Sequence, residues 1–332
     1  MSDLKGVVVY CELREGAIAP IAFEGLGAGR KLADSLGQEL SSIVIGSGIG
    51  GLAPQVIAQG ADKVYIIDDL QLKDYQPDLY LSVMLKAVEA IKPQIIIMGQ
   101  TDYGRELASR LAFRLGTAAT LDCIDLDIDP DTKRLLQTKP VYGGNAHAVI
   151  TTETDPQIVT IRTKAMEALA PDASRKGEVV TLSVEVDAST VKTRILERVK
   201  EEVAGVKVED APVVVAGGRG IGSAEGFKQL DELAKLLKGA VGASRPACDN
   251  NWVPDTAQIG LTGKIIAPEV YFAIAISGSS QHMSGCSGAR TIVAINKDKE
   301  ANIFRQARFG VVGDWKKVLP AFTQKVKELL SS

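Results

Sequence analysis

The sequence predicts an α/β protein in two parts, an N-terminal α/β domain with an antiparallel β excursion and a C-terminal doubly wound parallel sheet. Two observations lead to this fold class. Short β-branched runs alternate with amphipathic helical segments, which is typical of parallel strands buried on both faces. The alternation stops near residue 123 and resumes near residue 212, in a chain of 332 residues that is too long for one ordinary core. We therefore expect domains over 1–198 and 212–332, joined by a linker over 199–211.

The N-terminal domain begins as a regular alternation of strands and helices. Each short apolar run is followed by a segment whose apolar residues recur at helical spacing. The expected strands are Gly6–Tyr10, Leu40–Ile45, Val64–Ile67 and Gln94–Met98, and the expected helices are Glu24–Leu36, Pro54–Gln59, Asp78–Ile91 and Tyr103–Leu115. Alternation of this kind predicts a parallel sheet that is covered by helices.

From Cys123 to about Val191 the pattern changes to alternating apolar and polar residues, without helices between the runs. The segments are "CIDLDIDP", "AHAVITTE", "QIVTIRT" and "VVTLSVEVD". Such alternation is typical of strands with one exposed face, so we expect an antiparallel excursion over the whole stretch. The following "VKTRILERVKEEVAGVKVEDAP" carries charges of both signs, and we interpret its part from 199 to 211 as a hinge.

The α/β alternation resumes at Pro212. The expected strands are Pro212–Ala216, Ala240–Ala243, Val270–Ile276, Thr291–Ile295 and Gly310–Val312, and Ala224–Leu237 is an expected helix. A last helical segment starts near Trp315, and Pro320 should either kink it or lie in its first turn.

Composition excludes several classes of function. The formal net charge is −3, with a pI of about 5.6 and no long basic run, which disfavours a nucleic-acid partner. The four cysteines are too dispersed for a local metal or iron–sulfur motif, and no apolar run is long enough to span a membrane. The start, "MSDLKGVVVYCEL", has the features of neither a signal nor a transit peptide, so we expect a cytoplasmic protein without a metal centre.

A glycine motif in the first domain admits two interpretations. Gly46, Gly48 and Gly51 match G-x-G-x-x-G after an apolar run, and Asp68 follows at about the twenty-residue distance of a ribose-binding acid. This spacing is typical of a stand-alone NAD-dependent oxidoreductase. However, the motif follows the second expected strand and not the first, and glycines serve any sharp strand-to-helix turn. Turn geometry is therefore the favoured interpretation.

The second domain gathers a denser set of glycine and polar residues at strand ends. Gly217–Gly222 contains Arg219 and precedes a helix, so backbone N–H groups and a fixed positive charge can face an anion. Two further strands end in Ser244-Arg245 and in Ser277–His282, and the carboxyl ends of parallel strands are where ligands bind. This set suits a ligand with a pyrophosphate and a polar aromatic ring. A hydrolase is disfavoured, because the sequence contains neither a G-x-S-x-G elbow nor an evident acid–histidine pair.

Three segments of the second domain resemble the α subunit of electron transfer flavoprotein. They are "VVAGGRGIGSAEGF", "AVGASRPACDNNWVPDTAQIGLTGKIIAPEVYFAIAISGSSQHMSG" and "TIVAINKDKEANIFRQARFGVVGD", and the first domain is similar to the family through "DYGRELASRLA" and "KPVYGGNA". The resemblance implies a heterodimer with a β subunit, in which the first domain of this chain binds no flavin and the second binds FAD. It also implies a one-electron carrier between a dehydrogenase, such as an acyl-CoA dehydrogenase or a similar flavoenzyme, and an acceptor. Some members of the family split the electrons of NADH between two acceptors, and the sequence leaves that activity open.

The resemblance also implies which residues meet FAD. They are Arg219, Ser244, Arg245, Ile259, Gly260, Leu261, Thr262, Ser277, Gly278, Ser279, Ser280, Gln281, His282, Asn296 and Asp314. The family places the Arg245 guanidinium against the isoalloxazine ring, the Thr262 hydroxyl near flavin N5 and His282 near the pyrimidine edge. These three are the expected redox-tuning contacts, because fixed positive charge and preorganised donors favour an anionic reduced flavin. Asn296 and Asp314 are expected at the adenosine half.

Some positions depart from the family or carry a second interpretation. Leu261 stands where the family often has glutamine, so we expect it to contribute only its backbone, and Lys139 stands where the family usually has arginine. Asp314 also suits the N-cap of the last helix. His282 also suits a buried structural histidine, and His147 is interpreted as structural alone.

Overall fold

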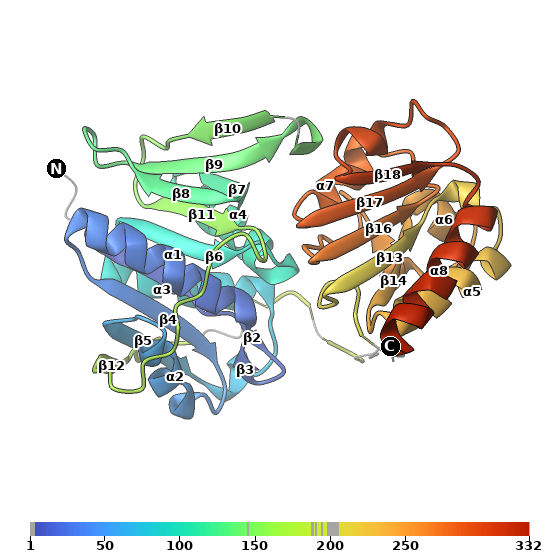
Figure 1. The fold of residues 1–332 in the computed structure, drawn as a ribbon. Helices are drawn as coiled ribbons and strands as arrows, with labels where there is room; N and C mark the ends of the chain where they lie inside the picture. The colour runs from blue at the N-terminus through green and yellow to red at the C-terminus, as the bar shows by residue number, and fades with distance from the viewer. Residues whose placement is uncertain are drawn as a thin grey trace. The chain divides into compact units, whose positions relative to one another are not determined.

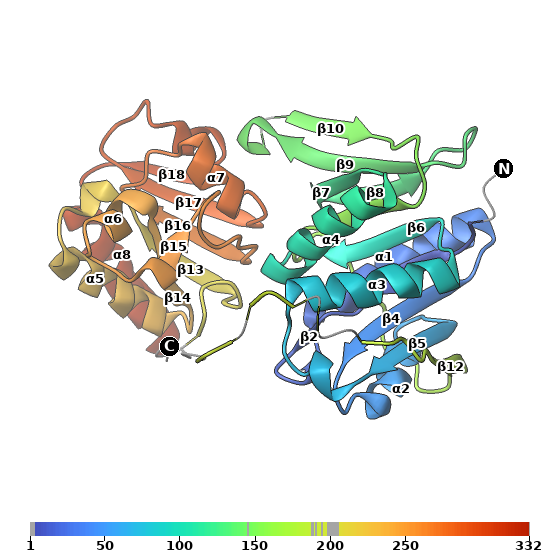
Figure 2. The ribbon, with the colours of Figure 1, turned by 180° about the vertical axis from the view of Figure 1, so that it is seen from behind.

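The computed structural model describes residues 4–144, 146–186, 189, 191–193, 195–197 and 206–331. The chain divides into two compact units, one of Met1–Pro140 with His147–Arg198 and one of Val141–Ala146 with Val199–Ser332. Each unit is built around a parallel β-sheet with helices on both faces (Figures 1 and 2). Residues 199–205 of the predicted hinge lie outside the described residues.

The first unit contains a seven-stranded sheet in the order β12-β5-β4-β1-β6-β11-β7. Its strands are β1 (Val7–Tyr10), β4 (Leu40–Gly46), β5 (Lys63–Asp68), β6 (Ile95–Gly99), β7 (Ala119–Cys123), β11 (Gln157–Ile161) and β12 (Glu178–Thr181). Helices α1 (Pro20–Leu36) and α2 (Ala53–Ala58) pack on one face, and α3 (Pro77–Ile91) and α4 (Asp102–Leu115) on the other. The central strands read as continuous apolar runs because both of their faces are covered.

The predicted extent of the antiparallel excursion is wrong. Only β8 (Asp125–Ile128), β9 (Leu135–Val141) and β10 (Ala146–Ile150) form a separate three-stranded sheet, in which β8 and β9 are antiparallel. The run "QIVTIRT" instead supplies β11, which lies parallel between β6 and β7, and "VVTLSVEVD" supplies β12, which pairs parallel with β5.

The polar residues of β11 explain this error. Gln157 and Thr160 interrupt the apolar run, so the strand does not read as a continuous apolar one, but all five of its residues are buried. The Gln157 Oε1 accepts a hydrogen bond of 2.9 Å from the Leu135 N–H, and the Thr160 hydroxyl accepts one of 2.9 Å from the Asp122 N–H. Because the Gln157 Oε1 and the Thr160 hydroxyl find partners inside the protein, polar residues occur here in a fully buried strand.

The second unit contains a six-stranded sheet in the order β15-β14-β13-β16-β17-β18, and all of its strand pairs are parallel. The strands are β13 (Val213–Gly217), β14 (Ala240–Ser244), β15 (Gln258–Ile259), β16 (Val270–Ile274), β17 (Thr291–Asn296) and β18 (Phe309–Val312). The helices are α5 (Ala224–Leu236), α6 (Arg245–Asp249), α7 (Ser280–Cys286) and α8 (Trp315–Ser331), with Pro320 inside α8 and beyond its first turn. If the strands are numbered in chain order, the sheet reads 3-2-1-4-5-6, which is the doubly wound order.

Candidate functional site

The strand order of the second unit has its switch point between β13 and β16, and we call the region outside the carboxyl ends of these two strands the crevice. These strands are neighbours, but the chain leaves them toward opposite faces of the sheet. The helix α5, which follows β13, packs into the apolar core of one face, and α7, which follows β16, packs into the core of the other. Ligands of open α/β sheets bind where the connections diverge in this way, outside the carboxyl ends of the strands. The candidate site therefore lies at the turns that follow Gly217 and Ile274.

Three glycines in the two turns at the crevice have no room for a side chain. A Cβ atom on Gly218 would lie 2.2 Å from the Ala275 carbonyl oxygen, and one on Gly220 would lie 2.9 Å from the Ala275 Cβ. A Cβ atom on Gly278 would lie 2.3 Å from the Ile303 nitrogen. Ala275 itself has a φ of 53°, a conformation that costs a non-glycine residue energy and often marks a functional site.

Unpaired backbone donors accompany this close packing. Within the described part of the chain, the N–H groups of Ser277, Gly278 and Ser279 donate no hydrogen bond to the protein. Arg219, in the short helix η5 (Arg219–Ile221) of the other turn, is exposed and adds a positive charge. Open amides together with an arginine are the groups that bind a phosphate or diphosphate.

The end of β14 brings two more predicted residues to the same edge of the sheet. Ser244 is buried, whereas the side chain of Arg245 is exposed at the start of α6. The Arg245 Nε lies 3.5 Å from an Asp249 carboxylate oxygen, four residues further along the chain. Such an exposed ion pair contributes little to stability, so Arg245 can exchange it for a ligand contact at low cost.

The segment Gln258–Lys264, which we call the QIGLTGK loop, contains four of the predicted site residues. It begins as β15, in register with the end of β14, so that Ile259 lies beside Ser244. Ile259 is buried, while Leu261 and Thr262 are exposed. The Leu261 N–H donates a hydrogen bond of 2.7 Å to the Gln281 carbonyl oxygen, which fixes the loop against α7.

His282 is buried, and both of its ring nitrogens have partners. Its Nδ1 lies 3.1 Å from the Ile259 carbonyl oxygen, and its Nε2 lies 2.7 Å from the Tyr271 hydroxyl. A carbonyl oxygen only accepts hydrogen bonds, so Nδ1 carries the proton and Nε2 accepts one from Tyr271. Burial lowers the pKa of His282 from 6.5 to about 4, which keeps the ring neutral near pH 7. In this structure the ring therefore connects β16, α7 and the QIGLTGK loop.

Asn296 and Asp314 lie at the ends of neighbouring segments of the same unit. The Asn296 Nδ2 donates a hydrogen bond of 2.9 Å to the Ile276 carbonyl oxygen, which braces the turn after β16. The Asp314 carboxylate accepts a hydrogen bond of 3.0 Å from the Lys316 N–H at the start of α8. Asp314 thus has the capping geometry that the sequence suggested as its second interpretation.

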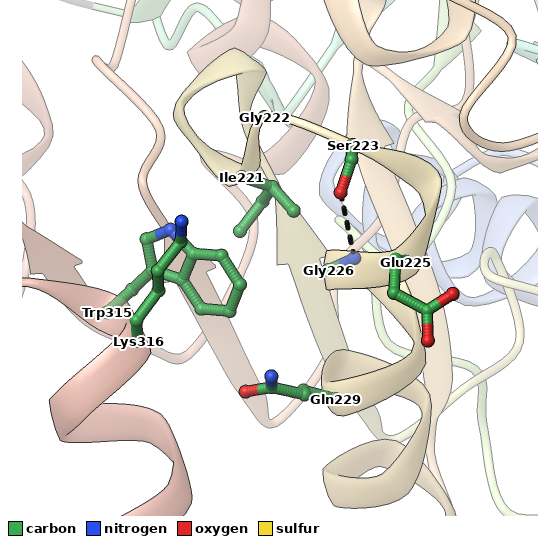
Figure 3. Close-up of a pocket in the computed structure, with 8 residues that line it drawn as sticks. All are labelled: Ile221, Gly222, Ser223, Glu225, Gly226, Gln229, Trp315 and Lys316. Carbon is green, nitrogen blue, oxygen red and sulfur yellow. Dashed lines mark hydrogen bonds between the residues drawn. The ribbon is translucent and has the colours of Figure 1, made fainter.

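Trp315 is a residue of this region that sequence reasoning did not select. Its indole Nε1 donates a hydrogen bond of 3.1 Å to the Gly220 carbonyl oxygen, which ties the start of α8 to the glycine turn. Trp315 also lines an open pocket of about 330 Å³ (Figure 3). The pocket is lined by Ile221, Gly222, Ser223, Glu225, Gly226, Gln229, Trp315 and Lys316. No sequence pattern marks Trp315, because its partner is a backbone oxygen that lies 95 residues away in the chain.

In the glycine motif of the first unit, two backbone amides are already hydrogen-bonded to the side chain of Asp68. The Asp68 carboxylate accepts hydrogen bonds of 2.7 Å from the Gly48 N–H and 2.9 Å from the Ile49 N–H. These are the amides that a bound pyrophosphate would use, and a carboxylate already neutralises them. The arrangement favours turn geometry and does not support an NAD site at Gly46, Gly48, Gly51 and Asp68.

No helix in the described part of the chain is both long enough and apolar enough to cross a membrane. The same residues contain no group of three or more histidine, cysteine or acidic side chains that could hold a metal ion. All four cysteines are buried and free, and burial raises the pKa of Cys11, Cys123 and Cys286 to about 12, so these thiols stay protonated.

Comparison with known proteins gives one consistent result. Residues 7–187 match the family model of the electron transfer flavoprotein domain, and residues 207–287 match that of the electron transfer flavoprotein FAD-binding domain. The chain is 41% identical to the electron transfer flavoprotein subunit alpha of Thermoanaerobacterium thermosaccharolyticum, over 99% of this chain and 100% of that one. It is also 41% identical to the same subunit of Megasphaera elsdenii, over 99% and 98% of the two chains. Protein FixB of Clostridium saccharobutylicum is 39% identical, over 100% of this chain and 99% of its own.

Proposed function

Because this chain belongs to the electron transfer flavoprotein α-subunit family, we propose that its second unit carries FAD and relays single electrons between a dehydrogenase and an acceptor. It works as one half of a heterodimer with a β subunit, in the cytoplasm. The observation that carries this proposal is the crevice between β13 and β16, where glycines with no room for a Cβ atom lie beside unpaired amides and the exposed Arg219. The crevice lies within the stretch that matches the family's FAD-binding domain.

The open amides and the exposed arginine of the crevice suit the diphosphate of FAD. A diphosphate needs close backbone amides and positive charge; the amides of Ser277–Ser279 and the exposed Arg219 offer them. FAD supplies the redox chemistry, because its ring system can take up and release electrons one at a time. The chain supplies binding, orientation and electrostatics.

Arg245 is the residue that most directly adjusts the electrostatics of the site. Within the described residues its guanidinium engages only Asp249, and that contact is exposed. A guanidinium at the carboxyl edge of the sheet stabilises negative charge that arrives on a bound ring, and it can lie flat against the ring. The neutral His282 adds no charge of its own, so its contribution is to hold the QIGLTGK loop in place.

The test is to produce the chain together with a β subunit of the same family and to measure bound FAD by absorbance and by release. We expect a yellow heterodimer in which the α chain retains FAD, and no NADH oxidation by the α chain alone. A colourless complex, or NADH turnover by the α chain alone, would contradict the proposal.

The same preparation identifies the partners. One FAD per heterodimer, together with reduction by an acyl-CoA dehydrogenase, would assign the complex to simple electron transfer. Two FAD per heterodimer, together with NADH oxidation by the complex, would assign it to electron bifurcation.

A further inference from the structure

The QIGLTGK loop is closed by its own backbone. The Lys264 N–H donates a hydrogen bond of 2.7 Å to the Gln258 carbonyl oxygen, and the Gly263 N–H donates one of 3.0 Å to the Gly260 carbonyl oxygen. The Gly260 N–H donates a third, of 3.2 Å, to the Lys264 carbonyl oxygen. A Cβ atom on Gly263 would lie 2.4 Å from the Gln258 carbonyl oxygen, so the loop has no space for a larger residue there. Its conformation is therefore strongly constrained.

The loop is also attached to α7. Besides the bond from Leu261 to Gln281, the Ile266 N–H donates a hydrogen bond of 2.7 Å to the Gly285 carbonyl oxygen. A Cβ atom on Gly285 would lie 2.3 Å from the Gly260 nitrogen, so the two backbones are in direct contact. The hydrogen bonds within the loop and those to α7 together hold its backbone in one conformation. Its exposed side chains are the part that remains free to change orientation.

One hydrogen bond joins two side chains within this loop. The Gln258 Nε2 donates to the Thr262 Oγ1 over 3.0 Å. A hydroxyl that accepts a hydrogen bond keeps its own proton to donate elsewhere. Among the described residues, the Thr262 hydroxyl donates to no protein acceptor, and its side chain is exposed. The loop thus presents one oriented O–H donor.

We propose that Gln258 is a positioning residue, which orients the Thr262 hydroxyl so that its proton points out of the loop to an acceptor atom of the bound flavin. This inference rests on the proposed function, because it requires FAD in the crevice of the second unit. Register with the end of β14 puts the loop beside Ser244, next to Arg245, at the edge of the sheet where that ring would lie. The amide of Gln258 suits this role because its N–H₂ group donates the hydrogen bond to Thr262. The threonine hydroxyl then keeps its own proton, which it can donate to the flavin.

Three substitutions, each made in the heterodimer, test this role. Gln258→Met keeps the length of the side chain but removes the donor. Gln258→Glu keeps the shape but reverses the bond, since a carboxylate accepts the threonine proton and withdraws it from the ligand. Thr262→Val removes the hydroxyl itself. We expect each to weaken FAD binding roughly 3- to 10-fold, the range of one ordinary hydrogen bond. Each should also change the visible circular dichroism of the bound flavin.

The decisive measurement is the double-mutant cycle. If Gln258 acts through Thr262, then Gln258→Met has no further effect on the dissociation constant or on the dichroism in the Thr262→Val background. Thr262→Ser retains the hydroxyl, and in that background Gln258→Met should keep its full effect. Gln324→Met, on the exposed side of α8, is the matched control and should behave as wild type.

The outcomes separate this inference from the function on which it depends. If Gln258→Met changes FAD binding and dichroism as much in the Thr262→Val background as in wild type, Gln258 only supports the loop. The inference would then be wrong. Unchanged binding and dichroism in Gln258→Met would also overturn it. A wild-type heterodimer that binds no FAD would instead overturn the proposed function, and the inference with it.

Discussion

The Tyr271 hydroxyl and the His282 Nε2 lie 2.7 Å apart in the interior of the second unit, between β16 and α7. The other ring nitrogen lies 3.1 Å from the Ile259 carbonyl oxygen, so a single imidazole links three segments of the chain. The hydrogen bonds to Tyr271 and Ile259 hold a neutral His282 in the core, so protonation of this ring should lower the stability of the second unit.

We predict that the second unit loses stability when His282 is protonated. Burial lowers the pKa of His282 to about 4 in the folded state, from 6.5 in the unfolded chain. Its contribution to stability is therefore complete above pH 6.5 and is lost as the pH falls toward 4. The free energy of unfolding should fall by about 3 kcal/mol in total, because each unit of difference between the unfolded and folded pKa of His282 corresponds to about 1.4 kcal/mol.

Urea unfolding of the chain and two variants between pH 7.5 and 4 checks this prediction. His282→Gln should be less stable than wild type near pH 7, and its stability should depend less on pH between 6.5 and 4. His147→Gln is the matched control, because His147 is the only other histidine in the sequence and is exposed. If His282→Gln keeps the pH dependence of wild type, the buried imidazole does not carry it.

Arg245→Ala should lower the midpoint potential for adding the first electron to the bound flavin by about 65–130 mV. A contact with a charged group contributes about 1.5–3 kcal/mol, and about 59 mV corresponds to tenfold for a one-electron couple. Arg245→Lys should restore only part of the loss, because an ammonium group cannot lie flat against a ring. A redox titration of the heterodimer measures the effect. Arg290→Ala, which removes another exposed arginine ion pair of the same unit, should leave the potential unchanged.

Gly218→Ala should weaken FAD binding by more than about tenfold, since a Cβ atom 2.2 Å from the Ala275 carbonyl oxygen must displace the turn. Gly51→Ala is the matched control in the other glycine motif. Nothing lies within 4 Å of a Cβ atom at Gly51, so FAD binding and stability should not change. Equilibrium dialysis against FAD compares the two variants. Equal losses in both would mean that the first motif also takes part in binding.

Limited proteolysis tests the proposed hinge. We expect the first cuts within 199–211, where charged residues of both signs join the two units, and two resistant fragments that correspond to 1–198 and 212–332. Mass spectrometry of the early fragments locates the cuts. Cleavage that begins inside either fragment and spares 199–211 would argue against a hinge there.

The sequence predicts the alternating parts of this fold well and its polar interior poorly. The strand predicted at Pro212–Ala216 is β13, one residue displaced, because a buried parallel strand is a continuous apolar run. β15 went unpredicted, because two residues carry no periodicity. β11 was assigned to the wrong sheet, because its buried Gln157 and Thr160 interrupt the apolar run that marks a buried parallel strand.

In the candidate site, too, the sequence predicts some features well and others not at all. Glycines at strand ends point to close backbone approach, and the Cβ distances at Gly218 and Gly278 agree with that interpretation. The partners of His282 could not be predicted, because Tyr271 is brought to it only by packing of α7 on the sheet. In the first unit the sequence favours turn geometry and leaves a ribose-binding role for Asp68 as the alternative, and in the structure the Asp68 carboxylate holds the turn.

The bond from Trp315 to the Gly220 carbonyl oxygen gives the chain an optical reporter. Indole fluorescence responds to the polarity and hydrogen bonding around the ring, and this indole is 6% exposed and attached to the glycine turn. The sequence has one other tryptophan, Trp252, which lies 6.5 Å from the Phe227 ring between centroids. In a Trp252→Phe chain, the emission wavelength and lifetime would therefore come from Trp315 alone. Movement of the turn on ligand binding could then be followed in real time without any added dye.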